Sequence, residues 1–450
     1  MKSKLAYFFP LAVMTVTPIC AAAQQTTDSE DNEKIITEGS KLEIVRATGE
    51  VKKILKRARH DEPSAIPTPK FAIRTKNNSF VMSVGGEIAG ILGYDIGNNL
   101  YSQSDAGLSF VTGDIPVPAT KNHRGDFYIN PFNSFVDFTM VGLAGTPDEI
   151  TAYIKLGTNG NNASLALSRA YLTWRNFTVG EALTIAQDPY ASQPPTIDPE
   201  GPCGDISTVT YQIAYKSKHY NGFAFAAALE MPSYYSSNGI YRGHDYAEYY
   251  GKEVDATVPE YVPNVPLWVE YQASESNRVR FTAILRDFAY RDLVSDTRRH
   301  TLGWGTSLTG NFSFWKPLTF NFVAAYGKGI GNYLQDIAGR PISFTPVDDQ
   351  PGHMQANPMM GLVFGASYNA TSKLQFNAVG SMSRIWDVSD YATVSDNANY
   401  RYAVYVAANC FYNITPWLQW GIEYLYGRHN TWDIGGANDS RLQTQIAFTF

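Results

Sequence analysis

The amino-acid sequence predicts an all-β protein, a sixteen-stranded antiparallel transmembrane β-barrel with short periplasmic turns, long outer loops and one inward-folded constriction loop. Three observations lead to this prediction. From residue 78 onward, apolar and polar residues alternate with a period of two. The alternating segments are long enough to cross a bilayer core as tilted strands, which takes about 9–11 residues. Short connections between the segments take turns with long ones.

The composition is compatible with a membrane barrel and argues against a helical membrane protein. Aromatic residues make up 14% of the 450 residues, charged residues only 17%, and the formal net charge is -6. Beyond the extreme N-terminus, no run approaches the roughly 18 apolar residues of a spanning helix. After residue 78 no helical period interrupts the alternation, which excludes crossover helices and a parallel sheet.

The first 70 residues differ from the rest. Residues 1–23 predict a secretory signal peptide, in which a lysine-containing start precedes an apolar run and three alanines form the cleavage site. Residues 24–70 are charged, nearly free of aromatics and Pro-rich at their end. They predict a periplasmic N-terminal extension that is either helical or disordered. The transmembrane β-barrel then occupies 71–450.

Sixteen strands follow in order. They are predicted near 79–94, 126–141, 149–157, 164–175, 176–184, 207–217, 221–231, 265–273, 278–291, 299–312, 317–326, 359–370, 372–386, 399–412, 416–428 and 440–450. A soluble sandwich or propeller would have strands of about 5–6 residues and similar loops at both ends. The even number of long strands therefore favours a closed barrel, and sixteen strands leave a water-filled lumen.

The connections fall into two classes. Short turns are predicted at 175–176, 274–277, 370–372 and 413–416, and long loops near 95–125, 185–206, 232–264, 327–358, 387–398 and 429–439. Aromatic residues flank both classes, as two girdles at the membrane surfaces require: Trp174, Trp315 and Trp417 beside short turns, and Tyr94, Tyr326 and Tyr426 beside long loops. In strand order, 185–206 is the third long loop, and its prolines suit a stiff constriction.

The last strand shows why the barrel must close. In 440–450 the side chains from Leu442 to Phe450 are apolar on one face, while Arg441 to Thr449 occupy the other. Inside lipid every backbone group must be hydrogen-bonded internally, so this strand is expected to pair with the first. The aromatic C-terminal residue, Phe450, resembles the signal that barrel-insertion machinery reads.

The stretch 168–204, "SRAYLTWRNFTVGEALTIAQDPYASQPPTIDPEGPCG", resembles the DcaP-like family of trimeric outer-membrane porins. The matching positions are Arg169, Tyr171, Asn176, Phe177, Thr196, Asp198, Gly201 and Pro202. The similarity returns at 326–336 and 421–429 and covers most of 71–450. It implies a homotrimer that passes small, often anionic solutes such as dicarboxylates. Two departures stand out: Glu181 replaces a neutral polar residue, and 24–70 matches the family's coiled coil poorly.

Alternation and loop position together predict the residues of the pore. The predicted lining is Arg169, Tyr171, Arg175, Glu181, Asp198, Glu200, Gln212, Lys216, Arg280 and Arg286. Strict alternation from Phe177 sends Glu181 outward, but the resemblance sends it inward, and we assign it to the lumen because a carboxylate is costly on a lipid face. This leaves Thr178, Gly180 and Ala182, like Ala166, Ser168 and Ala170, for a subunit contact. Arginines opposite an acidic loop would create a transverse field that orients solutes. Alternatively, each arginine forms an internal ion pair that braces the loop.

These patterns predict a porin in the outer membrane of a Gram-negative bacterium, in contact with outer-membrane lipid and small hydrophilic solutes. The alternative is an adhesin or structural barrel with little conductance. We expect no enzyme, catalytic residue, metal, cofactor or nucleic-acid partner, because no HExxH or paired CxxC motif is present. Cys203 and Cys410, a loop and a strand position, are expected to stay unpaired.

Overall fold

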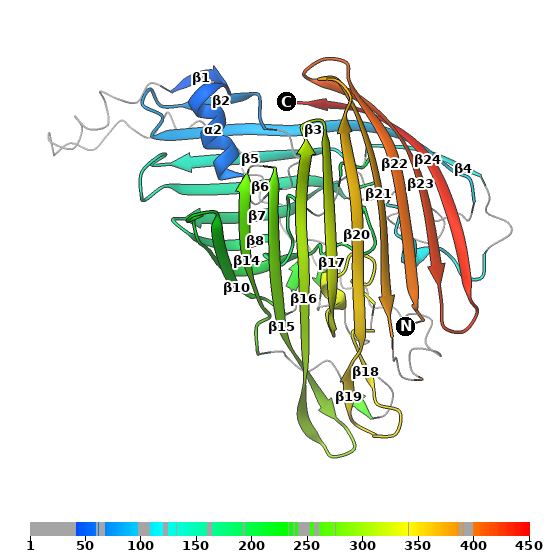
Figure 1. Ribbon diagram of the computed structural model, residues 1–450. Coiled ribbons are helices and arrows are strands. Elements are labelled where there is room, and N and C mark those ends of the chain that lie inside the picture. The colour runs from blue at the N-terminus through cyan, green and yellow to red at the C-terminus, as the bar shows by residue number, and fades with distance from the viewer. Residues whose placement is uncertain are drawn as a thin grey trace, which may run out of the picture.

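The computed structural model describes residues 42–59, 62, 68–97, 109–119, 125–131, 133–159, 164–191, 194–232, 234–236, 239–241, 253–255, 261–274, 276–340, 342–386, 390 and 399–450. The predicted signal peptide lies outside the described residues. Those residues form one closed antiparallel barrel of sixteen strands (Figure 1), which confirms the predicted fold class.

The barrel strands follow one another around the wall. They are β3 (Phe80–Asp95), β4 (Asp126–Asn130) with β5 (Phe135–Gly142), β6 (Ile150–Asn159), β7 (Ser164–Trp174), β8 (Phe177–Leu183), β9 (Val209–Lys216), β10 (Phe223–Glu230), β14 (Val265–Ser274), β15 (Asn277–Asp292), β16 (Thr297–Trp315), β17 (Leu318–Lys328), β20 (Pro358–Asn369), β21 (Leu374–Ile385), β22 (Tyr402–Asn413), β23 (Leu418–Asn430) and β24 (Gly436–Thr449). Because β4 and β5 both pair with β3, they are two parts of one interrupted strand.

The last strand closes the barrel as predicted. β24 pairs antiparallel with β3, with Leu442 opposite Tyr94 and Phe448 opposite Ile88. Ile446 and its apolar neighbours on one face of β24 are exposed, whereas Arg441 and Gln443 on the other face are buried. The apolar face therefore points outward and the polar face inward, so that no strand edge at this seam is left unpaired.

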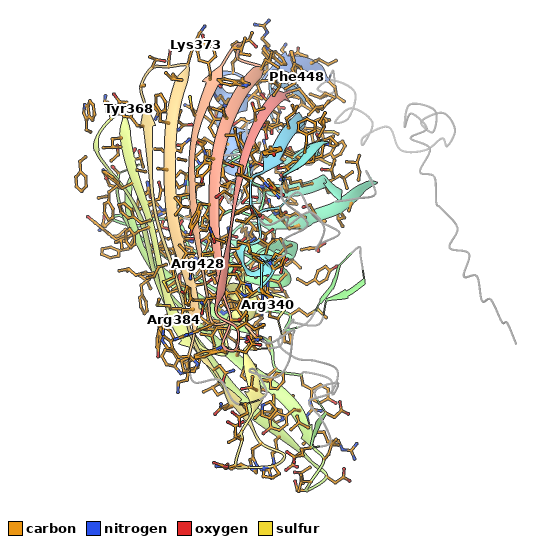
Figure 2. All side chains as sticks on the ribbon, turned by 90° about the vertical axis from the view of Figure 1, so that its right-hand side faces the viewer. Arg340, Tyr368, Lys373, Arg384, Arg428 and Phe448 are labelled. Atoms are coloured by element: carbon orange, nitrogen blue, oxygen red, sulfur yellow. The ribbon has the colours of Figure 1, made fainter. Side chains whose placement is uncertain are left out.

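The two ends of the barrel differ. Lys373 and Phe448 lie at the end with the short turns, the periplasmic end, while Arg340, Arg384 and Arg428 lie toward the opposite, outer end (Figure 2). At the outer end the hairpin of β15 and β16 extends beyond the other strands (Figure 1), and β16 alone has 19 residues. The outer loops also contain short elements: η1 (Thr112–Asp114), β11 (Tyr234–Ser236), β12 (Gly239–Tyr241), β13 (Val254–Asp255), η3 (Gly331–Tyr333), β18 (Phe344–Pro346) and β19 (Met354–Ala356).

A small N-terminal unit sits on the periplasmic end. It consists of β1 (Glu43–Arg46), α2 (Gly49–Ala58) and β2 (Phe71–Arg74), and β2 links β1 to the start of β3. The buried face of α2, including Leu55, packs against Val81 of β3 and Val141 of β5. This apolar contact fixes where the chain enters the barrel. No helix in the described ranges is long and apolar enough to cross a membrane.

Candidate functional site

The loop between β8 and β9, residues 184–208, runs across the lumen to the far wall, as predicted for a constriction loop. Asn321 of β17 donates a hydrogen bond to the Tyr190 carbonyl (3.1 Å), and Asn409 of β22 donates to the Pro195 carbonyl (2.8 Å). Farther along, Gly204 lies so close to Leu362 of β20 that a Cβ there would come within 2.6 Å of its backbone nitrogen. The loop is therefore held along its length by strands from the second half of the chain.

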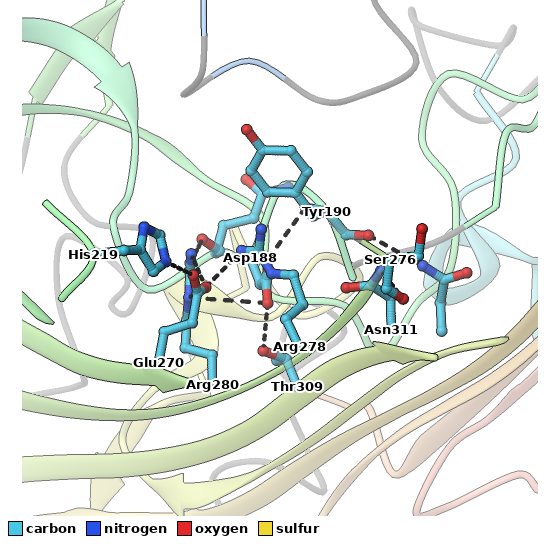
Figure 3. Close-up of polar contacts among 11 residues, drawn as sticks. Asp188, Tyr190, His219, Glu270, Ser276, Arg278, Arg280, Thr309 and Asn311 are labelled. Carbon is cyan, nitrogen blue, oxygen red and sulfur yellow. Dashed lines mark hydrogen bonds and ion pairs between the residues drawn. The ribbon is translucent and has the colours of Figure 1, made fainter. Parts of the chain in front are cut away.

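The firmest attachment is a buried ionic cluster, which we call the clamp and define as Asp188, Glu270, Arg278 and Arg280 (Figure 3). Arg278 donates to Asp188 of the loop (3.0 Å) and to Glu270 of β14 (2.6 Å). Arg280 donates to Glu270 (2.8 Å) and to the Gln187 carbonyl (3.1 Å). None of the four residues is more than 6% exposed. Two cations and two carboxylates are thus removed from water together.

Neighbouring groups complete the clamp. Thr309 of β16 donates to the second oxygen of Asp188 (2.8 Å), and His219 lies 2.9 Å from the free oxygen of Glu270. The guanidinium of Arg278 lies over the ring of Tyr190, 4.1 Å from its centre. Burial opposes ionisation of Asp188, but the charges of Arg280 and Arg278 outweigh it and hold the pKa of that carboxyl below its ordinary value.

The predicted acidic residues of the loop do not face open water. Asp198 is buried and accepts hydrogen bonds from the backbone N–H groups of Phe110 and Gly201 and from the Tyr405 hydroxyl (2.9, 3.1 and 3.1 Å). Glu200 accepts a hydrogen bond from Gln335 (2.7 Å). Burial, and next the charge of Asp198, raise the pKa of Glu200 to about 7. Both carboxyls therefore anchor the loop.

Further outer loops pack beside the constriction loop. Asp336 joins them: its carboxylate accepts from the Thr112 hydroxyl (3.0 Å), the Gly113 N–H (2.9 Å) and the Tyr400 hydroxyl (2.7 Å). Around this centre lies an apolar core shared by loops and wall, which includes Phe110 and Ile206 from two of the loops. The outer half of the lumen thus contains a packed interior, which narrows the passage.

The opposite wall is covered from the N-terminus. Arg59, directly after α2, donates to Asp137 of β5 (2.7 Å). Glu62 is 4% exposed and accepts hydrogen bonds from Arg169 and from the Tyr171 hydroxyl of β7. Alternation predicted Arg169 and Tyr171 on the lumen side, and the structure places them there, in contact with the chain's own N-terminal segment.

A pocket of about 570 Å³ opens at the periplasmic end. Lys70 and Glu87 line it from the N-terminal side, and Lys373, Asn413 and Trp417 line it from the turns. Burial lowers the pKa of Lys70 from its ordinary value, and the charge of Lys52 adds to this effect. The pocket thus presents two ammonium groups and one carboxyl group to the periplasmic mouth.

Arg175 corrects the predicted lining. It lies in the tight turn between β7 and β8 with a φ of 54°. Its side chain is 57% exposed and pairs with Asp148 of the preceding turn (2.7 Å). Because the strand ends at Trp174, the alternation that would have turned Arg175 inward no longer applies. Arg175 therefore does not line the lumen.

Glu181 also differs from its predicted place. It pairs with Ala170 and Tyr211, and the neighbours of Tyr211 on that face, such as Ile213, are exposed on the outside. Directly paired residues share a face, so Glu181 points outward. Strict alternation from Phe177 indicated this; the assignment to the lumen by resemblance and lipid cost was wrong. Its neighbours Thr178, Gly180 and Ala182 face inward, not toward a subunit contact.

A bulge changes the outward face of β7. The register shifts between Lys155 and Leu156 of β6, which leaves Ser168 as an extra residue. Leu165 and Leu167 are exposed on the outside, so Ala166 faces inward. The predicted outward row of Ala166, Ser168 and Ala170 therefore keeps only Ala170.

The remaining predicted residues face inward but are committed to partners. Arg280 belongs to the clamp, and Arg286 donates to the Gly329 carbonyl (2.6 Å). Gln212 donates to the Leu183 carbonyl (2.6 Å), which steadies the base of the constriction loop. Lys216 lies on the inward face of β9 opposite Ala226. For the arginines of β15, the bracing alternative describes the structure.

Sequence reasoning missed two residues of the site. Arg278 is the first residue of the predicted strand 278–291 and alternates with Arg280, so counting back from Arg280 in twos would have found it. Glu62 lies in a Pro-rich segment without hydrophobic periodicity, so no local sequence pattern marked it. In the described part of the chain, no group of three His, Cys, Asp or Glu side chains could hold a metal ion. Cys203 and Cys410 are free, as predicted.

No protein-family model and no curated protein sequence matches the chain. Solved structures match its fold. The outer membrane channel DcaP of Acinetobacter baumannii has a TM-score of 0.67 at 18% identity, covering 84% of this chain and 99% of that one. OmpT of Vibrio cholerae, an outer membrane protein, has 0.51 at 11%, covering 83% and 99%. OmpF of Salmonella typhi, in complex with daunomycin, has 0.51 at 12%, covering 83% and 99%.

These matches agree with the resemblance seen in 168–204 and with the closed sixteen-stranded barrel. The chain therefore has the fold of the outer membrane channel DcaP, a transmembrane barrel of the kind found in Gram-negative outer membranes.

Proposed function

We propose that the protein is an outer-membrane porin through which small hydrophilic solutes diffuse passively. The observation that carries the proposal is the closed sixteen-stranded barrel with loop 184–208 fixed across its lumen by the clamp. A loop tied down by buried ion pairs keeps one shape, so the size of the passage beside it is constant. Such a passage sorts solutes by size and charge without energy coupling.

The proposed solutes are small anions, including dicarboxylates. Lys155 lies on the wall at mid-strand beside Arg169, whose charge is balanced by Glu62, and Lys70 and Lys373 line the pocket at the periplasmic mouth. Cations in a narrow, partly desolvated passage raise the local concentration of anions. The clamp does not contribute to this preference, since its two arginines are matched by two buried carboxylates.

The proposed assembly is a homotrimer, and the outward carboxylate Glu181 supports it. A carboxylate on the lipid side is unfavourable, and Glu181, only 7% exposed, lies beside Ala170 and Tyr211 on the outward face of β7 to β9. A neighbouring subunit at this face would supply polar partners. Replacing Glu181 by Arg should dissociate the trimer, which chemical cross-linking of the purified protein in detergent measures.

One observation favours the second candidate, an adhesin or structural barrel with little conductance. Several outer loops share a buried apolar core inside the lumen, and this core reduces the open cross-section.

Planar-bilayer recording separates the two functions. The porin proposal expects conductance steps, in groups of three for a trimer, and a reversal potential biased toward anions in a salt gradient. Cation bias would retain the pore and reject the anion preference. The absence of steps from folded, heat-modifiable protein would reject the porin and favour the structural barrel.

A further inference from the structure

The wall at β5 to β7 presents more hydrogen-bond donors than its partners use. Lys155 of β6 and Arg169 of β7 are directly paired, and the ammonium of Lys155 lies 4.2 Å from the centre of the Phe135 ring. Among the residues that the structure describes, the buried Nε of Arg169 and the buried hydroxyl of Tyr153 have no hydrogen-bond partner. Unpaired buried donors are costly, so this wall has unused capacity for an acceptor.

A carboxylate of the chain itself already occupies part of this capacity. Glu62 places one oxygen on Arg169 and the other 3.3 Å from the Tyr171 hydroxyl. An arginine nitrogen and a phenol hydroxyl are the donors that any carboxylate would use there. The Tyr171 ring in turn packs on Tyr153, 5.2 Å between centres, which brings the unpartnered hydroxyl of Tyr153 to the same patch.

Glu62 is held at this place by its neighbours in sequence. Arg59 is ion-paired to Asp137, and its guanidinium lies 5.7 Å from the centre of the Tyr153 ring. Before it, α2 is packed by its apolar face on the periplasmic rim. Glu62 is thus a tethered group whose high local concentration favours its binding over that of a free carboxylate.

We propose that Lys155, Arg169, Tyr153 and Tyr171 form a carboxylate-binding site on the lumen wall and that Glu62 is its built-in competitor. A carboxylate solute binds there by displacing Glu62 from Arg169. The unused donors of Arg169, Tyr153 and Lys155 then donate hydrogen bonds to the second oxygen of the solute carboxylate. Occupation by Glu62 weakens solute binding, which shortens the residence of each solute and keeps the passage clear. This inference rests on the proposed porin function.

The test is the affinity of purified, folded protein for succinate, measured by calorimetry in detergent and by current block in planar bilayers. Glu62→Gln removes the competing charge, and we expect succinate to bind about tenfold more tightly, the worth of one charge-assisted hydrogen bond. Adding Arg169→Gln to that variant should abolish the gain. Glu62→Asp, a milder change for folding, should give a smaller gain in the same direction.

Glu149→Gln is the matched control, because it removes the ion pair between Glu149 and Arg57 of α2, outside the lumen. Its succinate affinity should equal that of the unmodified protein. Unchanged or weaker succinate binding in both Glu62 variants would overturn the inference. Calorimetry keeps this outcome separate from failure of the porin function: absent conductance with tighter binding in Glu62→Gln would reject the pore and retain the site.

Discussion

Two walls of the lumen carry arginine–carboxylate pairs, and they are built differently. In the clamp, Glu270 and Arg280 are opposite each other on adjacent strands, and Asp188 is added by the constriction loop. At the wall of β5 to β7, the carboxylate comes from Glu62, which lies before the first barrel strand. The side chain of Arg169 there is 11% exposed, against 6–7% for the arginines of the clamp.

This difference makes Glu270–Arg280 a structural ion pair and, in our proposal, Glu62–Arg169 an exchangeable one. Strand register holds Glu270 beside Arg280, so their ion pair persists for as long as the barrel is folded. Glu62 depends on a packed helix and two ion pairs, and it can leave without breaking any strand pairing. The same kind of ion pair therefore stabilises one wall and, as we propose, can open to solutes at the other.

The largest effect is expected when the clamp loses a carboxylate. Glu270→Gln leaves two buried arginines with Asp188 alone, and removing one partner of a buried ion pair costs about 3–5 kcal/mol. The temperature at which the heat-modifiable band shifts on a gel should fall clearly. Glu62→Gln, by comparison, should change it little; equal losses in both variants would remove the distinction between the walls.

A methyl group at Gly204 tests how tightly the constriction loop fits the far wall. In Gly204→Ala the new Cβ would lie 2.4 Å from the Met382 carbonyl oxygen, and such overpacking costs about 1–3 kcal/mol. The loop should shift, and single-channel current should become noisier. Gly380→Ala on β21 is the control, since its Cβ would meet nothing within 4 Å. If the single-channel current of Gly204→Ala is no noisier than that of the unmodified protein, the loop accommodates the methyl group without losing its position.

The two ends of the constriction loop should respond differently to pH. The lowered pKa of Asp188 means that its stabilising contribution is lost only in acid, as the pH falls through that pKa. The raised pKa of Glu200, about 7 against an ordinary value of 4.5, means that the folded loop is favoured while Glu200 is protonated. Its contribution therefore declines as the pH rises from about 4.5 to 7.

Hydrogen exchange of residues 196–206, corrected for the intrinsic rate, measures this decline. Asp198, Asp336 and Asp114 act on Glu200 as like charges, and Gln335 donates a hydrogen bond to it. Protection should fall between pH 5 and pH 8 in the unmodified protein and stay constant in Glu200→Gln. A decline that persists in the variant would assign the pH dependence to another group.

The smallest effect is expected at the exposed pair of Arg175 and Asp148. Both side chains are more than half exposed, so water screens the charges and the pair is worth about 0–1 kcal/mol. Asp148→Asn should leave the gel-shift temperature and the reversal potential unchanged. A change in reversal potential would return Arg175 to the residues that select solutes.

The sequence by itself determined the sixteen strands, the closing contact of β24 with β3 and the entry of the third long loop into the lumen. A period of two is a local property of the extended backbone, so alternation could be read residue by residue. It also placed Arg169, Tyr171 and Arg280 on the lumen side. Strict alternation also gives the correct, outward face for Glu181.

Only the tertiary structure decided which charges are available to solutes. The partner of Arg169, Glu62, and the loop partners of Arg280, Gln187 and Asp188, come from segments far away in the chain, and no local pattern specifies contacts of that kind. The bulge at Ser168 and the end of β7 before Arg175 depend on pairing with neighbouring strands. Alternation reports the face on which a side chain lies; the packing of loops and N-terminus on that face determines whether the side chain meets water or a partner.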